Sequence, residues 1–447
     1  PSVRKLSQQV GVSITTVLQA YYWLESKGLI EARPQSGFYV CLEPRTLPPE
    51  PEISSPPLAA THVGVDDLIT KVFEAARDPD IIPLGAALPS PELFPNHRIT
   101  RLLSSVARRD PSACNTYDLA PGNQELRRQI ARRSLYWGGA LSVEDIVVTC
   151  GCTEALNLCL RAVTEPGDIV AVESPTYFVG LQIIETLGLK ALEIPTHPRD
   201  GISVEALEVA MEQVSIKACL VIANCHNPLG SCMPDESKKK LVALLARQRI
   251  PLIEDDIFGD LYPGSIRLKA LKAFDRKGWV LYCSSFSKTL APGYRVGWTA
   301  PGNFIRKATR LKRANTVGTP AVLQIMIAEF LENGGYDHHL RKIKKAYASQ
   351  VHRMTQAICR YFPKGTRVTR PKGGCVLWIE LPRTVDSLEL HRQAIEEKIS
   401  IAPGPIFSAK QQYRNFIRLN CGVLWSPRIE QALMILGRLT AELGNVK

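Results

Sequence analysis

The chain has 447 residues and a formal net charge of +12 at neutral pH. That length accommodates a small domain and a larger two-part body, and the basic excess suits a polyanionic partner, although many basic enzymes bind no nucleic acid. No apolar run is long enough to cross a membrane, and no secretory signal is visible. The twelve cysteines are scattered without a repeated Cys-x-x-Cys spacing, which argues against a disulfide framework or a metal site and favours a reducing cytosol.

The first forty residues predict two short helices followed by a pair of strands. An amphipathic helix is expected over residues 2–10, ending at Gly11. Ser13 is the expected N-cap of a second helix that runs to about Lys27, with an inner face formed by Val17, Ala20, Tyr21 and Leu24. Residues 29–40 then read as a two-stranded wing with a turn at its tip.

A helix, a turn, a second helix and a wing form an arrangement that reads DNA. The head resembles the GntR winged helix-turn-helix in four short motifs, at residues 1–6, 11–13, 28–30 and 36–37. The resemblance implies that five residues face DNA: Arg4, Ser13, Thr15, Thr16 and Gly37. Where many relatives carry arginine, this chain has Ile14 and Leu18, which favours contacts to thymine methyl groups over guanine readout. A small helical interaction module is the alternative.

The head and its connection to the rest of the chain carry two further expectations. Pro1 falls where the second helix of the GntR domain begins, so we expect the head, residues 1–42, to lack the first helix and to be loosely folded. Six prolines between residues 43 and 64 exclude a helix or a central strand. They predict an extended, semi-rigid linker, with a recognition motif for another protein as the alternative.

The segment 284–298 is the most informative part of the remaining chain. Lys288 stands among the hydroxyls of Ser284, Ser285 and Ser287, and Arg295 follows seven residues later. Such a lysine forms a Schiff base with an aldehyde, while hydroxyls and a guanidinium suit a dianionic phosphate. An aldehyde that carries a phosphate indicates pyridoxal 5′-phosphate (PLP). The alternative is a polar loop with a solvated lysine.

The segment resembles the cofactor-lysine motif of the fold-type I PLP enzymes, the aspartate aminotransferase group. The resemblance runs from about residue 66 to 447, and the other landmarks follow in the order of the family: 151–155 (GCTEA), 173–177 (ESPTY), 227–230 (NPLG), 254–256 (EDD) and 416–420 (FIRLN). It implies that the cofactor contacts Cys152, Thr153, Tyr177, Asn227, Asp255, Ser285, Ser287, Lys288 and Arg295. It further implies that Arg418 binds the substrate α-carboxylate and that Tyr117 reaches the phosphate of a neighbouring subunit.

The implied roles have a physical basis, and one position departs from the family. A carboxylate at Asp255 keeps the pyridinium nitrogen protonated, so that the ring acts as an electron sink. A helix N-terminus at Cys152 and Thr153 offers free amides to a phosphate. Three residues after Asp255 the family has a tyrosine that donates to the 3′-oxygen, whereas this chain has Phe258. We expect that change to blunt catalysis and to leave cofactor binding intact.

Short apolar β-branched segments alternate with amphipathic helices and predict an α/β body, residues 65–447, with a mainly parallel sheet. The Asn227, Asp255 and Lys288 motifs each follow such a segment, where open α/β sheets bind ligands. The C-terminal third is expected to form a smaller α+β domain, with residues 66–95 packed beside it.

A GntR head, a linker and an aminotransferase-like body resemble the plan of the MocR subfamily of bacterial regulators. The resemblance implies a dimeric, PLP-dependent transcriptional regulator that binds double-stranded DNA and an amine or amino-acid effector. An active amino-acid aminotransferase with a relic head is the alternative, and a PLP-binding protein without DNA is a weaker one.

Overall fold

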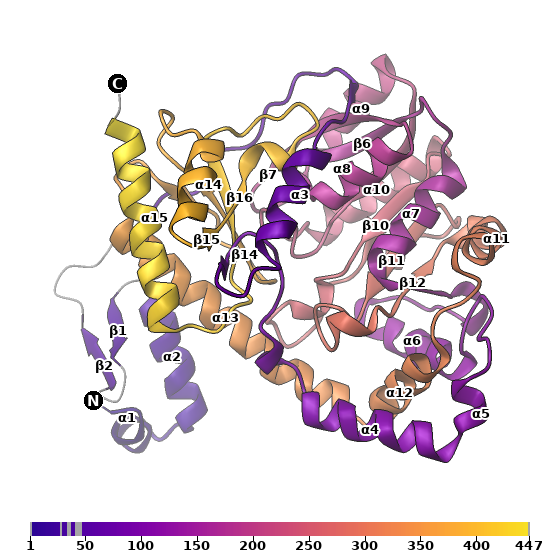
Figure 1. Cartoon of the computed structure of the whole chain (residues 1–447), viewed down its shortest axis with the longest axis horizontal. Coiled ribbons are helices and arrows are strands. Elements are labelled where there is room, and N and C mark those ends of the chain that lie inside the picture. Colours follow the sequence, from indigo (N-terminus) through magenta and orange to yellow (C-terminus); the bar gives the residue numbers. More distant parts are fainter. Residues whose placement is uncertain (1, 27–28, 34–36, 41–46, 446–447) are drawn as a thin grey trace.

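A mixed sheet of nine strands organises the larger part of the body in the computed structural model, which describes residues 2–26, 29–33, 37–40 and 47–445 (Figure 1). The order is β3-β7-β6-β9-β10-β11-β12-β5, with β8 beside β7. The five strands from β7 to β11 in this order are parallel, and β3, β8 and β12 are antiparallel to their neighbours. The bounds are β3 Thr61–His62, β5 Val147–Thr149, β6 Ile169–Ser174, β7 Lys190–His197, β8 Gly201–Ile202, β9 Ile216–Val221, β10 Leu252–Asp255, β11 Val280–Ser285 and β12 Gly297–Ala300.

Both faces of this sheet are buried, as near-continuous apolar strands predict. In β6, Val170 and Val172 join the apolar core on the face of α7 and α8, while Ala171 joins a second core with α9 and α10. The short apolar segments expected in the body thus correspond to strands of a mainly parallel sheet. The helices around the sheet are α4 Asn96–Arg109, α5 Pro111–Cys114, α6 Gln124–Ser134, α7 Gly151–Val163, α8 Phe178–Thr186, α9 Val204–Gln213, α10 Asp235–Arg247, α11 Ile305–Thr316 and α12 Ala321–Glu332.

A smaller antiparallel sheet, β13-β14-β17-β16, forms the second part of the body with three helices. The bounds are β13 Arg367–Val368, β14 Val376–Glu380, β16 Ala402–Pro403, β17 Phe416–Asn420, α13 Gly335–Tyr361, α14 Ser387–Glu396 and α15 Pro427–Asn445. The segment expected beside this domain divides between the two parts. Its strand β4, Ile82–Pro83, pairs with β15, Ile399–Ser400, whereas its helix α3, Asp66–Ala75, packs on the core of the large sheet.

The head contains α1 Val3–Val10, α2 Ile14–Ser26 and the hairpin of β1 Ile30–Arg33 with β2 Gly37–Val40. Ser2 caps α1, and Gly11 ends it in a left-handed conformation with φ 69°. Ser13 Oγ accepts from the Thr16 amide, which is the predicted cap of α2. Val17, Tyr21 and Ile30 form a small core, but Ala20 is exposed, so the inner face of α2 is narrower than predicted. Lys27 and the turn 34–36 lie outside the described residues.

The proline-bearing segment lies along the body from residue 47 onward. The Pro49 carbonyl accepts from the Val368 amide, Ser54 exchanges hydrogen bonds with Thr196, and Lys410 donates to the Pro57 carbonyl. The segment then enters the large sheet as β3. Within the described residues, no helix combines the length and apolar character that a membrane crossing requires.

Substitution of Gly437 tests how closely α15 packs on α13. Alanine usually stabilises a helix interior by about 0.5–1 kcal/mol relative to glycine. At Gly437, however, a Cβ would overlap the backbone carbonyl of Tyr361 on α13. We expect Gly437→Ala to lower the free energy of unfolding by about 1–3 kcal/mol, measured by urea denaturation. Gly444→Ala is the control, because its Cβ would lie 3.6 Å from Val385 Cγ2; equal effects of the two changes would contradict this packing.

Candidate cofactor site and DNA-facing head

Lys288 follows β11 at the carboxyl edge of the large sheet. Its ammonium Nζ donates to the Ala87 carbonyl at 2.7 Å. Burial lowers the pKa of Lys288, and the nearby cations Arg418 and Arg295 act in the same direction. A buried lysine with a lowered pKa is an activated amine nucleophile. The structure therefore buries the Lys288 amine at this edge of the sheet, next to the Ala87 carbonyl.

A second group of residues forms a cradle at the N-terminus of α7. Cys150, the N-cap, makes no side-chain capping bond, so its side chain leaves the first amides of α7 uncapped. Arg295 Nη1 donates to Ser287 Oγ at 3.2 Å, and Nη2 donates to the Cys150 carbonyl at 3.3 Å. A Cβ at Gly151, where φ is +82°, would overlap the Arg295 guanidinium, which explains the glycine. Free amides beside a guanidinium and a serine hydroxyl suit a phosphate.

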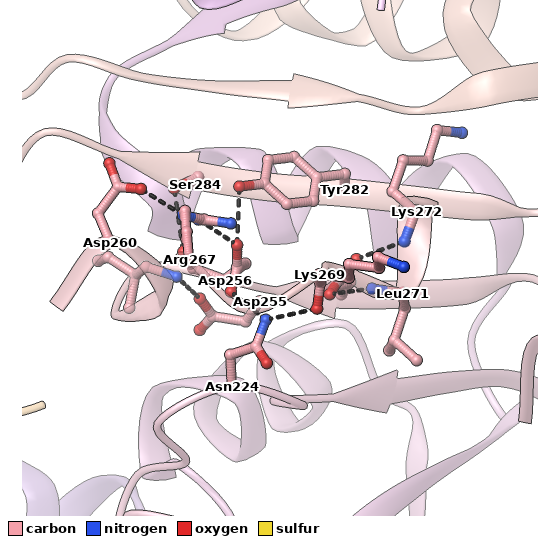
Figure 2. A network of polar contacts seen from close by, with 12 residues as sticks. Asn224, Asp255, Asp256, Asp260, Arg267, Lys269, Leu271, Lys272, Tyr282 and Ser284 are labelled. Carbon is pink, nitrogen blue, oxygen red and sulfur yellow. Dashed lines mark hydrogen bonds and ion pairs between the residues drawn. The ribbon is translucent and has the colours of Figure 1, made fainter. Parts of the chain in front are cut away.

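Three consecutive carboxyl groups, those of Glu254, Asp255 and Asp256, are buried at the end of β10. They accept hydrogen bonds from different kinds of donor (Figure 2). The Glu254 oxygens accept from the backbone amides of Leu271 and Lys272 at 2.7 and 2.9 Å. Burial raises the pKa of Glu254 to about 8. Asp256 Oδ2 accepts from Arg267 at 2.6 Å and from the Tyr282 hydroxyl at 2.9 Å, and Asp256 Oδ1 accepts from Asn224 at 3.2 Å.

Asp255, the middle acid, has only neutral partners. Its Oδ1 accepts from the Ile257 amide at 3.1 Å and from the Cys152 thiol at 3.5 Å. Burial raises the pKa of Asp255 to about 6. A buried carboxylate without a cation is costly, and a protonated ring nitrogen would supply that cation. The site therefore fits a pyridinium at Asp255.

Arg418, on β17, is fully buried. It donates to Asn227 Oδ1 at 3.2 Å and to the Gly85 carbonyl, and its guanidinium lies over the rings of Phe178 and Phe407. Its Nε has no hydrogen-bond partner among the described residues, and burial lowers the pKa of Arg418 to about 10. A buried guanidinium with an unused donor is suited to a carboxylate ligand.

The remaining predicted residues are placed less uniformly. Tyr177 precedes α8 and is partly buried, and Ser285 Oγ accepts from the Ser287 amide at 3.2 Å. Thr153 is exposed in the first turn of α7. Tyr117 is 82% exposed, and within the described residues no hydrogen bond or ion pair joins it to the other predicted positions. Phe258 is buried in an apolar core with Trp137, Tyr282 and Phe286.

All five predicted DNA-facing residues are exposed on the head: Arg4, Ser13, Thr15, Thr16 and Gly37. Arg4 lies on α1, and the Ser13 and Thr16 hydroxyls, 2.8 Å apart, lie at the start of α2. Gly37 begins β2 with φ +98°, a conformation that glycine adopts without strain. These residues are thus accessible, as DNA contact requires, although the capping bond occupies the Ser13 hydroxyl.

Sequence reasoning missed the partners of the lysine segment. Helix α13 holds this segment through Tyr347, whose hydroxyl donates to the Lys288 carbonyl at 3.2 Å, and through His339, which lies 2.8 Å from the Thr289 carbonyl. The Ala87 carbonyl was missed as well. No motif surrounds these residues, and apolar periodicity along α13 predicts only that they are buried.

The comparisons with known proteins agree with the two-part architecture. Residues 90–434 match the family model of aminotransferase class I and II, and residues 1–40 match that of the gntR family of bacterial regulatory proteins. The HTH-type transcriptional regulators YdcR and YjiR of Escherichia coli (strain K12) are 41% and 42% identical over 99% and 98% of this chain, and over 94% and 93% of their own lengths. The structure of the α-aminoadipate aminotransferase LysN from Thermus thermophilus, complexed with N-(5′-phosphopyridoxyl)-L-leucine, matches with a TM-score of 0.78 and 28% identity, covering 84% of this chain and 95% of that one.

The body thus has the fold of the fold-type I PLP aminotransferases, with pyridoxal 5′-phosphate as its cofactor, and it is joined to a GntR-type helix-turn-helix. The chain belongs to the GntR-family regulators that carry an aminotransferase-like domain, the MocR architecture. The residues present fit the cofactor, because the cradle at Gly151, the carboxyl group of Asp255 and the amine of Lys288 all border one site.

The raised pKa of Asp255 predicts how the free energy of unfolding of the cofactor-free protein depends on pH. Its folded pKa, about 6, exceeds the unfolded value of about 3.9, so its stabilising contribution is complete below about pH 4 and is lost as the pH rises through 6. Asparagine keeps the acceptor oxygen and does not ionise. We expect cofactor-free Asp255→Asn to be more stable than the parent at pH 7.5, by about 1–3 kcal/mol, with the difference vanishing near pH 4.

Urea denaturation of the cofactor-free proteins across this pH range measures the effect. Asp256→Asn is the matched control and should destabilise the protein at pH 7.5, because it leaves Arg267 without the Asp256 carboxylate. A destabilised Asp255→Asn variant at pH 7.5 would contradict the assignment of Asp255 as the carboxyl group that awaits a cation.

Proposed function

We propose that this protein regulates transcription by binding DNA through its head, under the control of an amine or amino-acid effector that the body captures with PLP. One observation carries the proposal: an exposed helix-turn-helix face is joined to a buried site whose charged groups have only neutral partners. Lys288 bonds to a carbonyl, Asp255 to an amide and a thiol, and Arg418 to an amide and a carbonyl oxygen. Such groups are arranged for a charged ligand.

The residue roles form part of this proposal. When bound, PLP supplies an aldehyde and an electron-accepting ring. Lys288 is the attachment point, Asp255 pairs with the ring nitrogen, and Arg418 binds the carboxylate of the effector. The ring would lie on Tyr177 with Asn227 at its 3′-oxygen, and the phosphate would lie among Cys152, Thr153, Ser285, Ser287 and Arg295. We place the domain limits at 1–42 for the head, 43–64 for the linker and 65–447 for the body. We further propose that the protein is cytoplasmic and forms a homodimer in which Tyr117 reaches the phosphate of the neighbouring subunit.

Loss of cofactor binding tests the body. Lys288→Ala should abolish covalent attachment, and reduction with borohydride should label a peptide containing Lys288 only in the parent protein. Arg295→Ala should weaken PLP binding by roughly 2–3 kcal/mol, about what a buried charge-assisted contact contributes, measured by absorbance titration. Normal PLP affinity in Arg295→Ala would place the phosphate elsewhere.

Salt dependence of DNA binding tests the head in the full-length protein. Arg4 is exposed on α1 and is expected to contact phosphate, so Arg4→Ala should weaken binding to every sequence. The change should also reduce the slope of log affinity against log salt by about one. Thr16→Ala should instead relax sequence preference, because a base contact carries discrimination. Fluorescence anisotropy with the protein's own promoter region and with random DNA measures both effects.

An active aminotransferase with a relic head is the second candidate, since the site retains the lysine, carboxylate and arginine of a working enzyme. Phe258 favours effector capture over turnover, because it lacks the hydroxyl that the aminotransferases place near the cofactor oxygen. Two results together would favour the enzyme over the regulator. They are fast transamination of common amino acids by the full-length, PLP-loaded protein, and no preference of that protein for its own promoter over random DNA.

A further inference from the structure

Helix α13 is the one long helix of the body that approaches both the lysine segment and the head, within the parts of the chain that the structure describes. It spans 27 residues, from Gly335 to Tyr361, and is therefore about 40 Å long. Figure 1 shows it extending from the end of the body near α12 to the side of the head. Its two halves make contacts of different kinds.

The N-terminal half holds the segment that carries the cofactor lysine. The Tyr347 hydroxyl donates to the Lys288 carbonyl at 3.2 Å, and Nε2 of His339 lies 2.8 Å from the Thr289 carbonyl. Burial lowers the pKa of His339, which favours the neutral ring, and a carbonyl only accepts, so Nε2 carries the hydrogen. The Tyr336 hydroxyl lies 2.8 Å from Thr289 Oγ1.

These contacts extend to the acids at the end of β10. The Tyr336 hydroxyl also donates to Asp260 Oδ2 at 2.9 Å. Arg267 joins Asp260 to Asp256, the neighbour of the proposed ring-nitrogen partner Asp255. These polar contacts thus link α13 both to the lysine segment and, through Asp260 and Arg267, to Asp256. Tyr336, His339 and Tyr347 are at most 5% exposed, so any rearrangement of the lysine segment must break their bonds or move the helix.

The C-terminal half of α13 meets the head at the end of α2. Nε2 of His352 lies 3.5 Å from Glu25 Oε2, and Gln356 Nε2 donates to the Glu25 carbonyl at 3.4 Å. Glu25 is 6% exposed, so the head packs against the body at this point. His352 and Gln356 are four residues apart and share one face of the helix. Tyr347 precedes His352 by five residues, which is roughly 8 Å along the axis.

We propose that α13 positions the lysine segment through Tyr336, His339 and Tyr347 and seats the head through His352 and Gln356, so that cofactor occupancy at Lys288 and the DNA affinity of the head are coupled through this helix. The inference rests on the proposed function and adds the route of control. A helix packed along its length moves as a unit, so a shift at Tyr347 reaches Glu25 without a separate hinge.

The test is a ratio of affinities in the full-length protein. The dissociation constant for DNA from the protein's own promoter region is measured by anisotropy with saturating PLP and after PLP removal, and the two values are divided. Typical coupling between sites predicts a ratio that differs from one by roughly fivefold or more, in either direction. The double variant His352→Ala, Gln356→Ala should bring the ratio to within twofold of one, with PLP affinity and the absorbance spectrum unchanged.

Tyr347→Phe approaches the coupling from the other end. It keeps the ring and removes one hydroxyl, so it should shift the absorbance of the bound cofactor and also reduce the ratio. Ser349→Ala, at an exposed position between the two sets of contacts, is the control and should leave both readouts unchanged.

The outcomes separate the two levels of the argument. A parent ratio that differs from one and persists in the double variant overturns α13 as the route and leaves the regulator intact. A parent ratio of one overturns control of DNA binding by PLP, and the proposed coupling through α13 is then wrong as well. A ratio that collapses in the double variant, with an unchanged cofactor spectrum, supports the proposal, because merely structural damage would alter both.

Discussion

Burial of three successive carboxyl groups at the end of β10 is the constraint on which the site depends. Burying a carboxylate costs several kcal/mol unless hydrogen bonds or a cation compensate. Backbone amides compensate Glu254, and Arg267 with Tyr282 compensates Asp256. Asp255, between them, receives one amide and one thiol. The chain thus satisfies the outer acids itself and leaves the middle one to its cofactor.

Two other charged groups of the proposed site also lack a charged hydrogen-bond partner. Lys288 is held by a carbonyl oxygen, and Arg418 keeps one nitrogen without a partner among the described residues although it is fully buried. Charged groups in this state raise the energy of the ligand-free protein and lower it when complementary charges arrive. A body of this kind is well suited to sensing, because occupancy changes its energy substantially even where turnover is slow.

The head contributes much less buried surface than the body. Its described core consists of a few side chains around Val17, and Glu25 is one of the residues through which it contacts α13. In the coupling proposed above, a shift of α13 reaches the head at the Glu25 contact.

The sequence by itself predicted most of the secondary-structure elements and suggested which residues contact cofactor and DNA, the roles proposed above. Apolar β-branched segments predicted strands because burial on both faces imposes local composition. The residue types at Lys288 and Arg295 suggested imine and phosphate chemistry, whereas the role of Asp255 came from the family resemblance. Ala20 was misassigned, because helical periodicity does not reveal how wide a face the neighbours cover. Only the tertiary structure decided that Lys288 meets Ala87, 201 residues away, and that Tyr347, 59 residues further on, holds its carbonyl. Contacts between residues so far apart in the chain leave no local pattern, because packing rather than spacing chooses the partners.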